Sequence, residues 1–198
     1  MLYSAGLIRT VARWWSGQDR CPLVADPVMV STSGALLLAP SAVRAIQDEL
    51  LPQCALVTPN LDEAVILTGR PLLNLDDLRR AARWIWSQFG CAALVKGGHL
   101  RRLPRAVDVF FDGRDEWLLE ADFVRGVQTH GTGCTYSAAI TAFLARGLPL
   151  FRAVSEAKAY VTGAISGSVR IGRHMALGWT SAMPGKARVR TSVTRLRE

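Results

Sequence analysis

The sequence lacks any apolar run near the roughly 18 residues that a membrane-spanning helix needs. Its first residues, MLYSAGLIRTVARWW, place no charged segment ahead of an apolar stretch, so they do not predict a secretory signal. Charged residues make up only 20% of the 198 residues and hydrophobic residues make up 49%, which excludes a disordered chain. The class that remains is a globular protein long enough to bury a substantial core.

Cysteine is scarce, and no two cysteines have CxxC spacing. A disulfide framework and a structural zinc site are therefore not expected, and a reducing cytoplasm is the predicted compartment. The four cysteines are Cys21, Cys54, Cys91 and Cys134.

Acidic residues are also few, 16 against 24 Lys and Arg, and the net charge is +8. Such a charge fits nucleic acid, an anionic membrane or an anionic small substrate. Half of the excess lies in Lys186–Glu198, where five basic residues accompany one acid. We expect residues 181–198 to be a solvated basic tail without regular structure, and we expect neither a nucleic-acid nor a membrane partner.

The pattern of apolar residues predicts helices that alternate with strands. This alternation indicates an α/β domain over residues 1–180, with a largely parallel central sheet and helices on both faces. The expected helices cover 5–15, 40–51, 60–69, 74–89, 131–147 and 151–169, and the expected strands cover 22–26, 55–59, 92–98, 106–112 and 116–121.

Polar clusters follow several of these predicted strands. In an open parallel sheet, ligands bind beyond the carboxyl ends of the strands. We therefore expect these clusters to gather at one edge of the sheet: Asp26, Asn60 with Glu63, Lys96, and the turn Thr129–Cys134.

The segment Gly131-Thr132-Gly133-Cys134 predicts a glycine turn that opens a helix. Exposed amide groups and the positive end of the helix would form a cradle for a phosphate, although a plain tight turn is the alternative. Cys134 would be a base or a hydrogen-bond partner for a hydroxyl nucleophile, unless it is inert and buried. His130 is a second candidate base, for which a role in positioning the loop is favoured.

Two acidic residues, Glu63 and Asp26, are candidate magnesium ligands, because magnesium needs only one or two carboxylates besides water and phosphate oxygens. The alternative for Asn60 and Glu63 is a capping box at a helix start, and the residues alone favour neither interpretation. Lys96 precedes two glycines and suits a nucleotide phosphate, unless it is simply solvated.

Taken together, these motifs resemble the hydroxymethylpyrimidine/phosphomethylpyrimidine kinases of thiamine biosynthesis, within the ribokinase-like superfamily. The resemblance covers residues 1 to about 170 and implies a three-layer sandwich around a mostly parallel sheet. The matching segments are VADPVMVSTSG (24–34), LLPQCALVTPNLDEAVILTG (50–69), ALVKGGHL (93–100), AVDVFFDG (106–113) and QTHGTGCTYSAAITAFLARG (128–147).

This resemblance implies ATP-dependent phosphorylation of 4-amino-5-hydroxymethyl-2-methylpyrimidine and of its monophosphate, with Mg²⁺ and ATP as cofactors. It implies an anion hole and catalytic position at Gly131, Thr132, Gly133 and Cys134. It also implies nucleotide contacts at Lys96, Asn60, Asp108 and Thr129, magnesium at Glu63 and Asp26, and pyrimidine contacts at Val28 and Met1.

The sequence departs from the family at its start, where members carry a strand and an AGSDxSGGAGIQAD-like segment. Met1-Leu2 resembles the end of a later KxGML segment. We therefore expect the N-terminal strands and much of the pyrimidine pocket to be missing, through a misplaced start, a truncation, or completion by another chain. Pyridoxal kinase-like activity and an inactive remnant that binds only nucleotide are the alternatives. A homodimer is an option, because members of this family commonly pair.

Overall fold

The computed structural model describes residues 2–17, 21–31, 34–98, 100, 103–127, 130–179 and 190–196. The chain forms two compact units. Unit 1 comprises Met1–Gly97, Asp108–Glu116 and Leu196–Glu198, and unit 2 comprises Gly98–Val107 and Trp117–Arg195.

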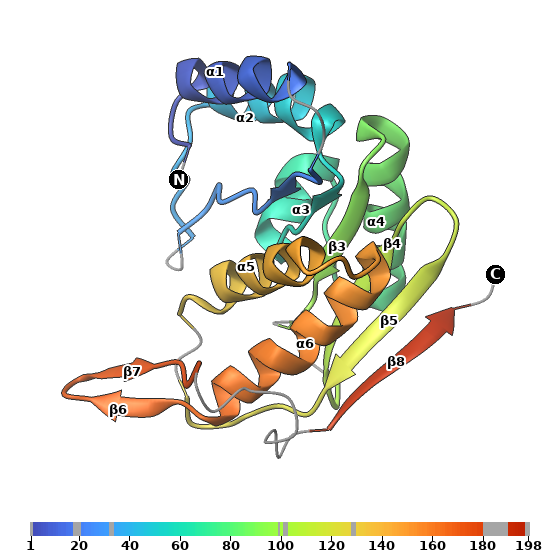
Figure 1. Ribbon diagram of the computed structural model, residues 1–198. Coiled ribbons are helices and arrows are strands. Elements are labelled where there is room, and N and C mark those ends of the chain that lie inside the picture. The colour runs from blue at the N-terminus through green and yellow to red at the C-terminus, as the bar shows by residue number, and fades with distance from the viewer. Residues whose placement is uncertain are drawn as a thin grey trace. The chain divides into compact units, whose positions relative to one another are not determined.

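Figure 1 labels α1, α2, α3, α4, β3 and β4, which belong to unit 1 in whole or in part. Its helical elements are α1 (Ala5–Ser16), α2 (Pro40–Ala45), the π-helical turn η1 (Ile46–Leu50), the 3₁₀ turn η2 (Leu51–Gln53), α3 (Leu61–Thr68) and α4 (Leu75–Phe89). Its strands are β1 (Val24–Ala25), β2 (Leu56–Val57), β3 (Ala92–Lys96) and β4 (Ala106–Phe111), of which β4 begins in unit 2.

The strands β1, β2 and β3 are parallel neighbours, and β4 is antiparallel to β3. Val24 is level with Leu56, and Leu56 is level with Ala92. Residues 92–95 are all buried, as in a parallel strand that is covered on both faces. The parallel pairing brings the carboxyl ends of the first three strands to one edge, as the sequence predicts.

Capping residues explain where the helices of unit 1 begin and end. Asn74 and Asp77 form a capping box at the start of α4, and Gly90 ends that helix in the left-handed region at φ 72°. Ser4 caps α1 by accepting a hydrogen bond from the amide of Leu7. The predicted helices at 5–15, 60–69 and 74–89 are confirmed. Within the described parts of the chain, no helix has both the length and the apolar character needed to cross a membrane.

A buried carboxylate joins α4 to the start of β5 (Glu116–Ala121). The Glu116 side chain is 2% exposed and lies 2.8 Å from Arg79 and 3.2 Å from Arg83. Burial acts to raise the pKa of Glu116, but hydrogen bonds from Arg83 and Arg79 hold that pKa below its usual value. The two arginines therefore keep a buried charge satisfied within unit 1.

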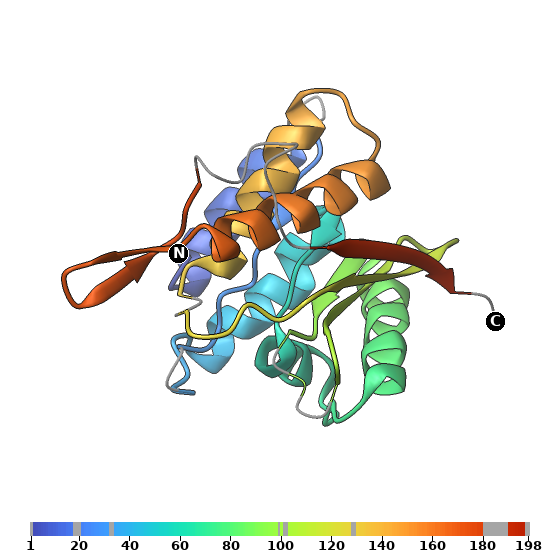
Figure 2. The ribbon, with the colours of Figure 1, turned by 90° about the horizontal axis from the view of Figure 1, so that it is seen from below.

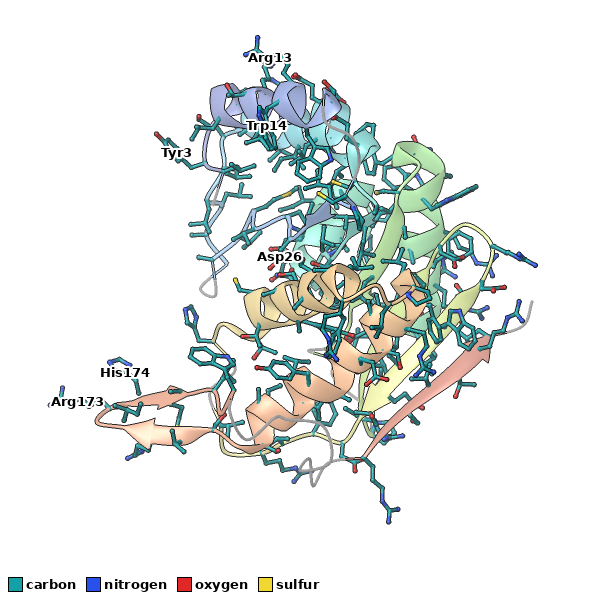
Figure 3. The ribbon with its side chains drawn as sticks, viewed as in Figure 1. Tyr3, Arg13, Trp14, Asp26, Arg173 and His174 are labelled. Atoms are coloured by element: carbon teal, nitrogen blue, oxygen red, sulfur yellow. The ribbon has the colours of Figure 1, made fainter. Side chains whose placement is uncertain are left out.

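Unit 2 contains the helices α5 (Thr132–Ala145) and α6 (Leu150–Ser166), which lie side by side (Figures 1 and 2). After α6, β6 (Val169–Ile171) and β7 (His174–Ala176) form an antiparallel hairpin. Figure 3 shows Arg173 and His174 at the end of this hairpin. The sequence predicted α5 and α6 but not the hairpin.

The end of the described chain is the strand β8 (Thr191–Leu196), paired with β5. Ser192 donates a hydrogen bond to Glu120 over 3.2 Å and accepts one from Arg105 over 2.8 Å. The Arg195 guanidinium lies 5.8 Å from the centre of the Trp117 ring. The prediction of a tail without regular structure is therefore wrong for Thr191–Leu196, while residues 180–189 and 197–198 lie outside the described residues.

The turn between β4 and β5 contains a glycine in a restricted position. Gly113 has φ 94°, and a β-carbon there would overlap the Trp86 ring. Gly69 is also left-handed, at φ 67°, but a β-carbon there would meet no atom within 4 Å. The two glycines therefore differ in the space available rather than in backbone handedness.

We expect Gly113→Ala to lower the free energy of unfolding by about 3 kcal/mol, because backbone strain adds to overlap with Trp86. The matched control Gly69→Ala is expected to lose only about 1 kcal/mol, from backbone strain alone. Urea unfolding of both variants measures the difference. Equal losses would contradict the close packing of Gly113 on Trp86.

Candidate functional site

Three strand ends in unit 1 bring polar side chains together. Asp26 follows β1, Thr58 follows β2 and Lys96 ends β3. The Lys96 ammonium Nζ lies 3.0 Å from Asp26 Oδ1, and the Thr58 hydroxyl lies 3.3 Å from the same oxygen. Both charged side chains are largely buried, with 13% and 14% exposed. Figure 3 labels Asp26, just beyond β1.

Glu63 lies in the first turn of α3 and forms a capping box with Asn60. The Asn60 amide donates to Glu63 Oε2 over 2.8 Å, and the Glu63 amide donates to Asn60 Oδ1 over 2.9 Å. The backbone of Met29 also donates to this carboxylate. The capping interpretation of Asn60 and Glu63 is thus confirmed.

The Glu63 carboxyl group is only 2% exposed. Burial raises its pKa from 4.5 to about 7, despite the Asn60 hydrogen bond and the Lys96 charge, and the negative charge of Asp26 adds to the rise. The hydrogen bonds and charges around Glu63 therefore do not fully offset the cost of burying its ionised form. Because the charges of Asp26 and Lys96 both act on the Glu63 carboxyl group, the three side chains lie near one another.

Two further predicted site residues, Asp108 and Val28, adjoin residues of this cluster. Asp108 on β4 is 3% exposed, is level with Lys96, and accepts a hydrogen bond from the Gly97 amide over 3.1 Å. Val28 is partly buried and, with Asp26, lines a small cavity of about 60 Å³. Asp108 therefore fixes the backbone after Lys96.

The side chains of this cluster fit magnesium. Two carboxylates, from Asp26 and Glu63, provide the hard oxygen ligands that magnesium takes alongside water and phosphate. Among the residues that the structure describes, no group of three or more His, Cys, Asp and Glu forms a complete metal site. The raised pKa of Glu63 agrees with a carboxylate that lacks a full counter-charge.

In unit 2, the start of α5 has the features of an anion cradle. Its N-cap, Gly131, is left-handed at φ 81° and, as a glycine, has no side chain with which to cap the helix. The Thr135 amide donates a hydrogen bond to Gly131 O over 2.9 Å, which is the first i to i−4 pairing of the helix. The amides of the preceding three residues, Thr132, Gly133 and Cys134, therefore lie before the regular helical pairing begins.

Cys134 and His130 are both exposed at this helix start. Cys134 is therefore not the buried cysteine of the alternative interpretation, while Cys54 and Cys91 are buried. Burial raises the pKa of the Cys54 thiol to about 12 and that of Cys91 to about 11. Of these three cysteines, only Cys134 is accessible to a ligand in solution.

The structure brings Asp26, Asn60, Glu63, Lys96 and Asp108 into unit 1, and it places the predicted cradle in unit 2. Thr58, which is 1% exposed and hydrogen-bonds to Asp26, was not predicted as a site residue. Its position near the carboxyl end of the predicted strand 55–59 was the available signal. Two predicted contacts, Thr129 and Met1, lie outside the described residues.

Comparison with known proteins gives consistent matches. A model of the family described as phosphomethylpyrimidine kinase matches residues 1–178. A hydroxymethylpyrimidine/phosphomethylpyrimidine kinase of Rhizobium meliloti (strain 1021) is 50% identical over 149 residues, which are 75% of this chain and 56% of that protein. The enzyme of the same name from Streptomyces coelicolor is 45% identical over 172 residues, which are 87% of this chain and 63% of that protein.

A solved structure shares the fold. The pyridoxal kinase from Staphylococcus aureus, in complex with AMP-PCP and pyridoxal, superposes with a TM-score of 0.87 at 30% identity, over 99% of this chain and 71% of that chain. The predicted ribokinase-like α/β fold class is confirmed. The chain spans less than two thirds of the length of the two curated relatives.

The raised pKa of Glu63 predicts a pH-dependent stability. In metal-free buffer, the folded state holds a proton on Glu63 that the unfolded state releases above pH 4.5. The free energy of unfolding should therefore fall as pH rises from about 5 to about 8, by on the order of 3 kcal/mol relative to Glu63→Gln. Urea unfolding at several pH values measures this difference.

Asp62→Asn is the control, because it removes one exposed carboxylate from the same helical turn. Its pH dependence should follow that of the unsubstituted chain. If the free energy of unfolding changed with pH equally in the unsubstituted chain and in Glu63→Gln, Glu63 would be ionised in the folded state throughout this range, and the prediction would be wrong.

Proposed function

The chain belongs to the phosphomethylpyrimidine kinase family, and from that premise we propose that it transfers the γ-phosphoryl group of ATP to 4-amino-5-hydroxymethyl-2-methylpyrimidine and to the monophosphate of that alcohol. The names of the relatives from Rhizobium meliloti and Streptomyces coelicolor support this assignment of substrate. Because the chain spans only 56% and 63% of those relatives, the assignment is tested on this chain itself.

The start of α5 carries the proposal. During phosphoryl transfer, negative charge lies on the oxygens of the transferred group, and fixed amides can stabilise that charge without reorganising. A left-handed glycine N-cap with no capping side chain suits this purpose. We assign Gly131, Thr132 and Gly133 to this cradle.

We assign Cys134 to the acceptor hydroxyl group. Its thiol is exposed at the third helical position, among the amides of the cradle. In the proposed reaction, Cys134 either takes the proton from the acceptor O–H or accepts a hydrogen bond from it. Both roles orient the hydroxyl oxygen for attack on phosphorus.

The polar side chains of unit 1 that surround Asp26 and Lys96 would bind the nucleotide. Lys96 supplies positive charge for ATP phosphates, and its ion pair with Asp26 holds the ammonium in place before ATP binds. Asp26 and Glu63 would hold magnesium, with Asn60 fixing Glu63 and Asp108 fixing the backbone after Lys96. When bound, magnesium neutralises charge on phosphate oxygens.

Pyridoxal is the second candidate acceptor, because the solved structure from Staphylococcus aureus is named for that substrate. Both acceptors are heteroaromatic alcohols, so one cradle could serve either. The two substrate assignments differ in the ring that must be bound. A cytoplasmic location, expected from the sequence, stays a prediction, and a homodimer stays an option that the family resemblance raises.

The deciding experiment is ATP consumption by the purified chain with magnesium, given the hydroxymethylpyrimidine, its monophosphate or pyridoxal in parallel. We expect turnover with both pyrimidines and a lower kcat/KM with pyridoxal. A higher kcat/KM with pyridoxal would favour the second candidate. A folded chain that binds ATP and turns over no acceptor would overturn the proposal.

We expect Cys134→Ala to lower kcat about 100-fold, because a positioned proton acceptor typically contributes a factor of this order. The KM for ATP should change little. Cys21→Ala is the matched control, since Cys21 is also an exposed cysteine. Equal kcat values for the two variants would exclude Cys134 from both proposed roles.

A further inference from the structure

Trp179 lies at the first turn of α5, although no sequence motif singles it out. Its indole Nε1–H donates a hydrogen bond to Thr135 Oγ1 over 3.3 Å, and Thr135 directly follows Cys134. The Trp179 residue remains 56% exposed. The ring is thus attached at its polar atom to the helix turn while much of its apolar surface faces solvent.

The backbone around Trp179 is fixed on α6. The Gly178 amide donates to Ala164 O over 2.9 Å, and the Tyr160 hydroxyl donates to Trp179 O over 3.2 Å. Leu177 is buried against Ala164. A β-carbon at position 178 would overlap the Gly167 carbonyl, so the two backbones are in direct contact. Trp179 is therefore held in place rather than loosely attached.

A held but exposed aromatic ring is suited to binding. Its hydrogen-bond donor is already satisfied, so the π faces and ring edges are what it can offer to a ligand. Tryptophan is enriched among the residues that contribute most to binding energy at interfaces. Heteroaromatic rings stack well on such a surface, because stacking needs no specific hydrogen-bond pattern.

We propose that Trp179 stacks on the heteroaromatic ring of the acceptor alcohol and thereby sets the acceptor KM. This inference rests on the proposed function. The acceptor ring is one methylene carbon away from the oxygen that attacks phosphorus, whereas adenine is separated from the transferred group by ribose and two further phosphates. A ring held by Thr135, the neighbour of Cys134, therefore lies nearer to the acceptor than to adenine.

The experiment compares steady-state kinetics of the full chain with those of Trp179→Ala and Trp179→Phe. Trp179→Ala should raise the acceptor KM about 10-fold or more, in line with the loss of one stacked ring, with little change in the ATP KM. Trp179→Phe keeps an aromatic face and should stay within about 3-fold of the parent. Trp14→Ala, which removes a 60% exposed tryptophan from α1, should leave both KM values unchanged.

An equilibrium measurement separates this inference from the proposed function. The hydroxymethylpyrimidine alone should quench tryptophan fluorescence of the parent chain, and this quenching should be lost in Trp179→Phe. Such quenching without any turnover would sustain the stacking role and sink the proposed activity. Turnover with an unchanged acceptor KM in Trp179→Ala would sustain the proposed activity and overturn the stacking role.

Two further outcomes overturn the stacking proposal. A rise in the ATP KM alone would assign Trp179 to the nucleotide. Equal rises in the acceptor KM for Trp179→Phe and Trp179→Ala would make the hydrogen bond to Thr135 the relevant feature, since both variants lose it. If Trp179→Ala does not fold, Trp179→Leu replaces it, because leucine is apolar and has no π face.

Discussion

The ion pair between Lys96 Nζ and Asp26 Oδ1, 3.0 Å long, joins the ends of β3 and β1 across the intervening strand β2. It exists because three parallel strands are aligned so that their carboxyl ends meet. A shift of one residue in any strand would turn its side chains to the other face. A pair this buried adds little net stability, because desolvation offsets much of the attraction. Its main effect is to hold two charges in a fixed orientation within unit 1.

Local chemistry made much of the fold predictable. Asn74 with Asp77, and Asn60 with Glu63, are capping boxes that the sequence displays directly, and glycines at positions 69 and 90 end the same two helices. The polar residues after each strand could also be predicted, because parallel pairing decides where strand ends meet. For Glu63, the sequence offered capping and magnesium as alternatives. The structure confirms the cap, and the burial of the carboxylate leaves it suited to a cation as well.

The rest depends on contacts between distant residues. The strand β8 contacts Arg105 and Glu120, which lie about seventy to ninety positions earlier. Its threonines and valine favour a strand, but the basic residues around it led to the prediction of a tail without regular structure. The pairing of Glu116 with Arg79 and Arg83 is likewise invisible in the local pattern. Trp179 was missed for the same reason, since its relation to Thr135 spans 44 positions. Contacts between residues far apart in the sequence, rather than local sequence patterns, fix the positions of these features.

The contact between Gly178 and Gly167 has a consequence for how acceptor preference can change. The backbone next to Trp179 packs directly on Gly167 through Gly178, and neither glycine has a side chain. The ring itself can be exchanged for another aromatic without moving the backbone. Any β-carbon at position 178 would instead push the backbones apart and displace the ring as a whole. Among variants of this chain, a shift in acceptor selectivity could therefore arise at a glycine that a search confined to ligand-contacting residues would pass over.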